Sequence, residues 1–200
     1  MPKNREIESK TLLEEAVFKE ILKSFPTKVE INQANYYFDT ADKILKTHRI
    51  AFRIRKFPDK AEATLKVPAN HQLQATYHEA IEINTDLSLE QAEQLIQGQG
   101  SFPGEVGEFL AQHFAGEKFI NQTWSKTHRY LLDGPEHVEL TLDQTSYPNK
   151  LLDYELEIEN NNCKDIERTL AKLTAQFKFE INSLTANQSK IGRAYKNAAR

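Results

Sequence analysis

The chain has 200 residues, of which 39% are hydrophobic and 28% are charged, so it is long enough to bury a core and has the composition of a globular protein. Its net charge of −3 gives no overall attraction for nucleic acid or for an anionic membrane, and its single cysteine, Cys163, excludes an internal disulfide and a multi-cysteine metal site. Because it has no 18-residue apolar run and no signal-like segment, we expect a cytoplasmic protein whose partners include neither nucleic acid nor a membrane.

Six segments alternate between polar and apolar residues, which is the pattern of a strand with one buried face. They are residues 5–10, 49–55, 62–67, 78–83, 137–143 and 154–159. Helical periodicity marks residues 12–25, 89–96, 105–114 and 165–177, and the polar segment 188–199 is also expected to be helical. This order predicts an α+β protein, mainly of antiparallel strands, in a single domain that covers residues 1–200.

Each predicted strand is charged on one face and apolar on the other. The charged faces hold, in chain order, Glu6, Glu8 and Lys10; Arg49, Arg53 and Arg55; Lys66; His78 and Glu82; Glu139 and Asp143; and Glu155, Glu157 and Glu159. A solvent-exposed sheet usually mixes the two signs within a strand, because opposite charges pair across strands. If the apolar faces pack outward against helices, the charged faces converge on an interior. We therefore predict a β-barrel with a polar lumen, acidic on one wall and basic on another.

The two kinds of charged face favour two kinds of ligand. Glu155, Glu157 and Glu159 are spaced roughly 7 Å apart along one strand face, where they would repel one another and raise their own pKa values. A divalent cation would remove that repulsion. Arg53 and Arg55 present the opposite case, since two guanidinium groups on one face are suited to bidentate contacts with phosphate.

Several motifs, in the same order, resemble those of the CYTH domain, the superfamily of triphosphate tunnel metalloenzymes. Glu6-Ile7-Glu8-Ser9-Lys10 resembles its opening Glu-x-Glu-x-Lys signature. The other matching segments are Tyr37-Phe38-Asp39-Thr40, Arg53-Ile54-Arg55, Thr64-Leu65-Lys66-Val67-Pro68, Leu142-Asp143 with Tyr154-Glu155-Leu156-Glu157-Ile158-Glu159, and Ser189-Lys190. The resemblance covers nearly the whole chain.

The resemblance implies an eight-stranded antiparallel β-barrel, called the triphosphate tunnel, with helices packed outside. It also implies a triphosphatase that uses Mg²⁺ or Mn²⁺ and acts on inorganic triphosphate, a nucleotide or thiamine triphosphate. Carried over by motif, the catalytic residues are Glu6, Glu8, Lys10, Glu155 and Glu157. The phosphate-binding residues are Lys10, Arg53, Arg55, Lys66, Arg129 and Lys190, and the metal ligands are Glu6, Glu8, Asp143, Glu155, Glu157 and Glu159.

Some points stay open in the sequence. For the phosphate-binding residue on the strand before the late hairpin, Lys126 is the alternative to Arg129, which is preferred because it precedes an aromatic residue. On the middle strand, His78-Glu79-Ala80 stands where the family usually has Arg-Glu-Glu. A cyclase that uses the 3′-hydroxyl of ATP as the nucleophile would need the same triphosphate grip. A non-catalytic module that binds a nucleotide or polyphosphate is a further alternative, which the many carboxylates disfavour. The oligomeric state cannot be inferred from the residues.

Overall fold

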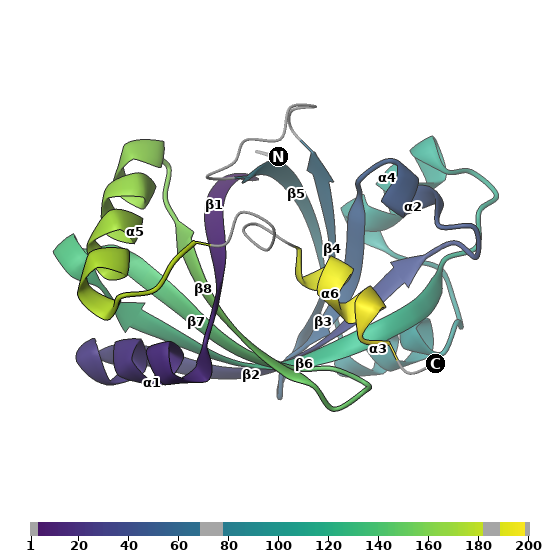
Figure 1. Cartoon of the computed structure of the whole chain (residues 1–200). Helices are drawn as coiled ribbons and strands as arrows, with labels where there is room; N and C mark the ends of the chain where they lie inside the picture. Colours follow the sequence, from purple (N-terminus) through teal and green to yellow (C-terminus); the bar gives the residue numbers. More distant parts are fainter. Residues whose placement is uncertain (1–3, 69–77, 182–188, 199–200) are drawn as a thin grey trace.

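Eight antiparallel strands close into a barrel in the order β1-β5-β4-β3-β2-β6-β7-β8. The computed structural model describes residues 4–68, 78–181 and 189–198, and for residues 4–6, 78 and 79 the backbone alone. β1 closes the barrel, because it pairs with β5 along one edge and with β8 along the other (Figure 1). The strands are β1 Asn4–Leu13, β2 Thr27–Asp39, β3 Ala51–Lys56, β4 Ala61–Pro68, β5 His78–Leu87, β6 Ile120–Asp133, β7 Glu139–Ser146 and β8 Leu152–Glu159. The predicted fold class is confirmed.

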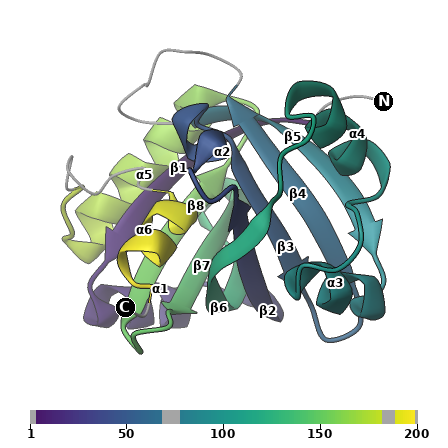
Figure 2. The ribbon, with the colours of Figure 1, turned by 90° about the vertical axis from the view of Figure 1, so that its right-hand side faces the viewer.

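Helices cover the barrel as two separate layers, each with its own apolar core. The helices are α1 Glu15–Ser24, α2 Ile44–Thr47, α3 Leu89–Ile96, α4 Gly104–His113, α5 Cys163–Phe177 and α6 Lys190–Lys196, with one 3₁₀ turn, η1 Pro135–His137. α1 and α5 pack against β1, β7 and β8, whereas α2, α3 and α4 pack against β3, β4 and β5 (Figures 1 and 2). α6 belongs to neither layer and packs on Tyr37 and Tyr147.

The two layers explain the apolar strand faces. Phe52 and Ile54 of β3 are fully buried in one core, and Leu156 and Ile158 of β8 are buried in the other. Since neighbouring side chains of a strand point to opposite faces, the charged residues between them must point into the barrel. The outward packing of the apolar faces is therefore what places the charges inside.

Two predicted strand boundaries were wrong, in each case because a turn intervenes. The strand expected at 49–55 begins at Ala51, since Arg49 has a positive φ of 59° and its N–H bonds to Lys46 O at the end of α2, a helix that the sequence pattern did not indicate. The strand expected at 137–143 begins at Glu139, because η1 occupies Pro135–His137.

Within one of the matching motifs, Asp39 has a structural role. Its carboxylate accepts hydrogen bonds from the backbone N–H groups of Leu45 and Lys46, at 2.9 and 3.1 Å. Asp39 thus satisfies donors of the short helix α2 that would otherwise lack partners.

No helix among residues 4–68, 78–181 and 189–198 combines the length and the apolar character needed to cross a lipid bilayer.

Phe52 provides a test of the outward core. Its ring centroid lies 4.7 Å from that of Phe102 and 5.3 Å from that of Phe38, so Phe52→Ala should lower the free energy of unfolding by about 3–5 kcal/mol. Chemical denaturation measures this loss. Leu152→Ala is the control, because this side chain is 52% exposed and should cost within about 0.5 kcal/mol. Equal losses in the two variants would contradict an apolar core outside the barrel.

Candidate active site

An ion-pair network inside the barrel is centred on Glu157 of β8. Its Oε1 accepts hydrogen bonds from Lys10 Nζ of β1 at 2.9 Å and from Lys190 Nζ of α6 at 3.2 Å, and its Oε2 accepts one from Arg129 Nη2 of β6 at 2.7 Å. Burial alone would raise the pKa of Glu157, but Lys10, Lys190 and Arg129 hold it well below its usual value. Glu157 is therefore a stable carboxylate that joins three elements.

Two further carboxylates beside Glu157 are fully buried and are held by arginines. Asp143 of β7 receives a bidentate contact from Arg129, with distances of 2.8 and 2.7 Å, and also bonds to Lys190. Both carboxylate oxygens of Glu155 accept hydrogen bonds from one nitrogen, Nη2, of Arg193 of α6, at 2.8 and 2.6 Å, and Glu155 lies 3.5 Å from Lys190. These two carboxylates orient cationic side chains that reach the interior from β6 and α6.

A second acidic group lies where β1 meets β5 and β8. Glu8 Oε2 lies 2.8 Å from Lys10 Nζ, and Lys66 Nζ lies 3.6 Å from Glu8 Oε1 and 2.8 Å from Glu82 Oε1. Glu159 faces Glu8 on the neighbouring strand, and burial together with the negative charge of Glu8 raises the pKa of Glu159. Glu159 thus experiences the like-charge repulsion that the sequence predicted for the whole acidic face.

Strands β2, β3 and β4 form a wall in which positive charge is weakly compensated. Arg53 Nη2 lies 3.9 Å from Glu82 Oε1 and Arg55 Nη1 lies 3.5 Å from Glu62 Oε1, whereas Arg55 Nε donates to Asn35 Oδ1 at 2.9 Å. Burial, with Arg53 and Arg129 nearby, lowers the pKa of Arg55 to about 9. An anion at this wall would favour the charged form of Arg55.

The predicted separation of acidic and basic walls is wrong on the side of β1, β7 and β8. Register explains the difference, because Lys10 lies opposite Glu157 and Arg129 lies opposite Asp143 on neighbouring strands. Burial would lower the pKa of Lys10, but Glu157 and Glu8 raise it above its usual value. On this side the carboxylates and cations are interleaved instead of segregated.

The structure places nearly all the predicted site residues in this interior. Those whose described side chains take part are Glu8, Lys10, Arg53, Arg55, Lys66, Arg129, Asp143, Glu155, Glu157 and Lys190. Glu159 faces Glu8, but it lies at the end of β8, where its side chain is partly exposed to solvent. Lys126, the alternative to Arg129, is exposed on the outer face, with its ammonium 5.5 Å from the centroid of the Trp124 ring. The side chains of Glu6, His78 and Glu79 lie outside the described residues, although β1 places the backbone of Glu6 opposite Ala80.

Arg193 is the main residue that the sequence reasoning missed. It is buried and contacts Glu155 and Asp153, and its Nε lies 3.1 Å from the hydroxyl oxygen of Tyr147. Ser189 begins the same helix by accepting a hydrogen bond from the Gly192 N–H at 3.2 Å. The spacing of Lys190 and Arg193, three residues apart in a segment expected to be helical, was a usable signal that both side chains share one face.

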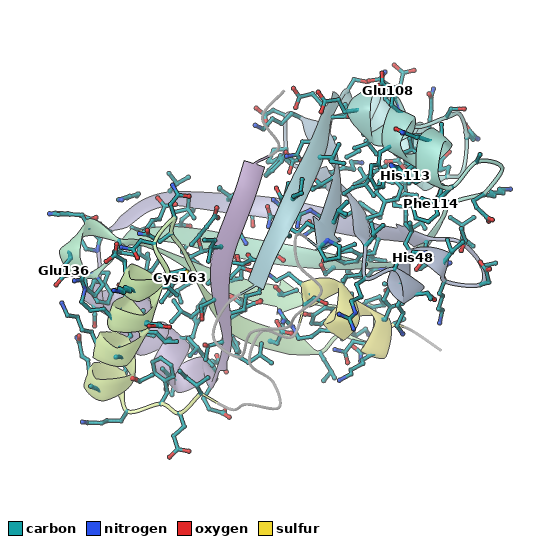
Figure 3. The ribbon with its side chains drawn as sticks, turned by 90° about the horizontal axis from the view of Figure 1, so that it is seen from above. His48, Glu108, His113, Phe114, Glu136 and Cys163 are labelled. Atoms are coloured by element: carbon teal, nitrogen blue, oxygen red, sulfur yellow. The ribbon has the colours of Figure 1, made fainter. Side chains whose placement is uncertain are left out.

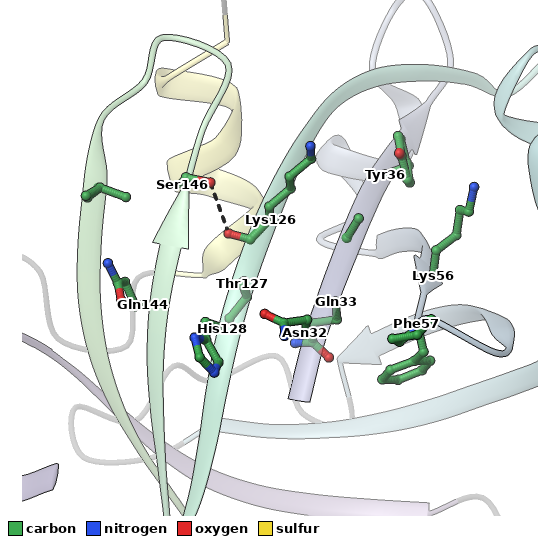
Figure 4. A pocket seen from close by; sticks show the side chains of 13 residues that line it. Asn32, Gln33, Tyr36, Lys56, Phe57, Lys126, Thr127, His128, Gln144 and Ser146 are labelled. Atoms are coloured by element: carbon green, nitrogen blue, oxygen red, sulfur yellow. Dashed lines mark hydrogen bonds between the residues drawn. The ribbon is translucent and has the colours of Figure 1, made fainter. Parts of the chain in front are cut away.

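Among the described residues, the histidines His48 and His113 and the cysteine Cys163 make no contact with this network. His48 and His113 pack against the rings of Phe114 and Phe109, and Cys163 begins α5 (Figure 3). A cleft of about 600 Å³ lies on β2, β6 and β7 (Figure 4), where Ser146 Oγ donates to the carbonyl of Lys126. The described lining of this cleft contains no carboxylate and none of the predicted phosphate-binding residues.

The chemistry of the interior fits Mg²⁺ or Mn²⁺, because carboxylate oxygens are the donors that these hard cations prefer. The like-charge repulsion between Glu159 and Glu8 on neighbouring strands, which Lys66 offsets only in part, is the observation that fits a further cation. Among the described residues, no three His, Cys, Asp or Glu side chains are arranged as a metal site, since lysines and arginines lie between the carboxylates. A divalent ion would therefore have to replace an ammonium group as the partner of these oxygens.

Comparisons with known proteins agree with this architecture. The CYTH domain model matches residues 4–195. HpAC1 from Hippeastrum, an adenylyl cyclase candidate described as having a dominant triphosphatase activity, has a TM-score of 0.81 and 19% identity, over 98% of this chain and 97% of that chain. A candidate adenylate cyclase from Bacillus halodurans has a TM-score of 0.77 and 27% identity, over 94% and 96%. The Mimivirus capping enzyme triphosphatase has a TM-score of 0.56 and 12% identity, over 89% and 91%. None of the curated proteins compared with the chain matches it.

Arg193 provides a test of the interior network that needs no substrate. Arg193→Gln removes the charged partner of a fully buried carboxylate, so it should lower the free energy of unfolding by ~3 kcal/mol and increase hydrogen exchange in α6. Chemical denaturation and mass-detected exchange measure the two effects. Arg168→Gln is the control, because the Arg168 side chain is 56% exposed on α5. If both variants behave alike, Arg193 does not anchor α6.

Proposed function

Because the chain belongs to the CYTH domain family, we propose that it is a divalent-metal-dependent triphosphatase, which hydrolyses an inorganic or organic triphosphate bound inside the polar barrel. The observation that carries this proposal is the convergence of cationic side chains from many elements on one interior. They are Lys10 of β1, Arg53 and Arg55 of β3, Lys66 of β4, Arg129 of β6 and Lys190 of α6. A chain of three linked phosphates is the kind of ligand that can contact all of them at once.

The cations have two roles in this proposal. Arg53 and Arg55, whose nearest carboxylates are farther away than those of the other four cations, hold phosphate oxygens as forks. Lys10, Lys66, Arg129 and Lys190 exchange a carboxylate contact for a phosphate contact when the substrate enters. Phosphoryl transfer depends mainly on such positioning and charge neutralisation, so no covalent intermediate is needed.

The carboxylates also divide into two groups. Glu8, Glu157 and Glu159, with Glu6, are the residues that would hold Mg²⁺ or Mn²⁺. Asp143 and Glu155, also predicted as metal ligands, each accept hydrogen bonds from an arginine at both carboxylate oxygens. We assign them first to the positioning of Arg129, Arg193 and Lys190. The ion, when bound, supplies additional neutralisation of the phosphate charge.

The reaction itself is a displacement by water. The oxygen of a water molecule forms a bond to the terminal phosphorus while the bond from that phosphorus to the bridging oxygen breaks. A carboxylate of the acidic group accepts the proton of the water. The cations along the barrel stabilise the charge that develops on the leaving phosphate chain, which for inorganic triphosphate is pyrophosphate.

An adenylate cyclase is the second candidate, because the 27% identical structure from Bacillus halodurans is described as a candidate adenylate cyclase. Its reaction would use the same grip on the triphosphate. The difference lies in the nucleophile, which would be the 3′-hydroxyl of ATP instead of water.

A product assay separates the candidates. The protein is incubated with inorganic triphosphate, ATP and thiamine triphosphate in Mg²⁺ and then in Mn²⁺, and phosphate, pyrophosphate and cyclic AMP are measured separately. We expect phosphate release from at least one substrate and loss of turnover in EDTA. Pyrophosphate together with cyclic AMP would instead indicate the cyclase, and binding without turnover would indicate a non-catalytic module.

Glu157→Gln tests the centre of the site. Because the loss of a charge-stabilising group from a preorganised site is costly, kcat should fall by ~10² or more at saturating metal. The free energy of unfolding should also fall, by ~2 kcal/mol, since Lys10, Arg129 and Lys190 each lose a charged partner. Glu139→Gln, on the exposed end of β7, is the control for both measurements. Wild-type turnover in Glu157→Gln would remove Glu157 from the site.

A further inference from the structure

Buried hydrogen-bond donors without partners gather on the wall formed by β2, β3 and β4. Among the described residues, Asn35 Nδ2, Arg53 Nε and Thr64 Oγ1 have no hydrogen-bond partner, and the same holds for Gln33 Nε2, two residues before Asn35. Asn35 and Thr64 are each only 1% exposed. A buried donor without a partner destabilises a folded protein, so several of them on one wall call for an explanation.

The register of the strands places these donors around the arginine pair. Asn35 of β2 lies directly opposite Arg55, and Thr64 of β4 lies directly opposite Arg53. Asn35 Oδ1 accepts the hydrogen bond from Arg55 Nε at 2.9 Å, which leaves the donor half of the amide, Nδ2, unused. The neutral donors of Asn35 and Thr64 thus lie on either side of the two guanidinium groups.

The contacts of the arginines indicate what this wall can bind. Their nearest carboxylate contacts, at 3.5 and 3.9 Å, are too long for hydrogen bonds, whereas Arg129 of β6 makes contacts of 2.7 and 2.8 Å. The wall therefore offers many donors and few acceptors. The matching ligand carries negative charge and several acceptor oxygens, as a phosphate group does.

We propose that Asn35 and Thr64 are phosphate-binding residues, which together with Arg53 and Arg55 form a four-residue subsite for one phosphate group of the substrate. This inference rests on the proposed function and extends it by two neutral residues. Thr64 lies opposite Arg53 of β3 and two residues before Lys66 on β4. When an anion draws Arg53 and Lys66 away from Glu82, Thr64 therefore becomes accessible. Asn35 then holds Arg55 with its oxygen and the anion with its nitrogen.

Thr64→Val gives the sharpest test, because valine keeps the shape of threonine and replaces only the hydroxyl, with a methyl group. The midpoint of chemical denaturation should stay level or rise, since no partner within the protein is lost. The Kd for inorganic triphosphate, measured by calorimetry in EDTA, and the KM with Mg²⁺ should both rise about tenfold. Thr145→Val is the matched control, because Thr145 is also buried and its hydroxyl bonds to that of Thr127 at 3.1 Å. This control should lose stability and keep its Kd within twofold of wild type.

Asn35→Asp provides an independent second test. The carboxylate still accepts the hydrogen bond from Arg55 Nε, but it replaces the unused donor with an acceptor and adds a negative charge. We expect the denaturation midpoint to rise and the Kd for inorganic triphosphate to increase by more than tenfold.

The outcomes distinguish this inference from the proposed function. If wild type neither binds inorganic triphosphate in EDTA nor turns over any triphosphate with Mg²⁺, the proposed function fails and the subsite with it. If wild type binds but Thr64→Val and Asn35→Asp keep its Kd and KM within twofold, the subsite alone is overturned. A loss of stability in Thr64→Val equal to that in Thr145→Val would show that solvent already satisfies the Thr64 hydroxyl. That result would also overturn the proposed subsite.

Discussion

The structure depends on the compensation of charges that a closed barrel removes from water. Helices cover the apolar outer faces of two groups of strands, so the charged faces can only point inward. A buried ion without a partner costs several kcal/mol, which is a large share of the stability of a small domain. Each interior charge must therefore find a partner, and the strand register decides which one it finds.

The interior meets this constraint unevenly. Around Glu157 the pairing is dense, because Lys10, Arg129 and Lys190 reach it from three different elements. Around Arg53 and Arg55 it is sparse, with longer ionic contacts and with neutral donors that have no partner among the described residues. The first region holds the barrel together in the absence of ligand. The second is better suited to take a ligand, because an anion there gains contacts without breaking strong ones.

This unevenness is compatible with the entry of a metal and a triphosphate together. A cation and an anion that enter as a pair offer each interior group a new partner of the correct sign. In the proposed function, Glu8 would exchange the ammonium of Lys10 or Lys66 for the metal, and those lysines would contact phosphate oxygens instead. Exchange of this kind avoids any state in which a buried charge is left alone, and it keeps the desolvation cost of binding low.

The sequence by itself determined most of the charged strand residues that line the interior, because a period of two sorts a strand into faces without any knowledge of its neighbours. Glu155, Glu157, Arg53 and Arg55 could be assigned to one environment in this way, and the motif order identified their family. The partner of each residue depended on the tertiary structure, since pairing requires the register between strands that are distant in the chain. Lys10 lies beside Glu157, 147 residues away, and Arg193 holds Glu155 from a helix that follows the last strand. No local pattern encodes those contacts, and for that reason the predicted acidic wall proved to be a network of ion pairs.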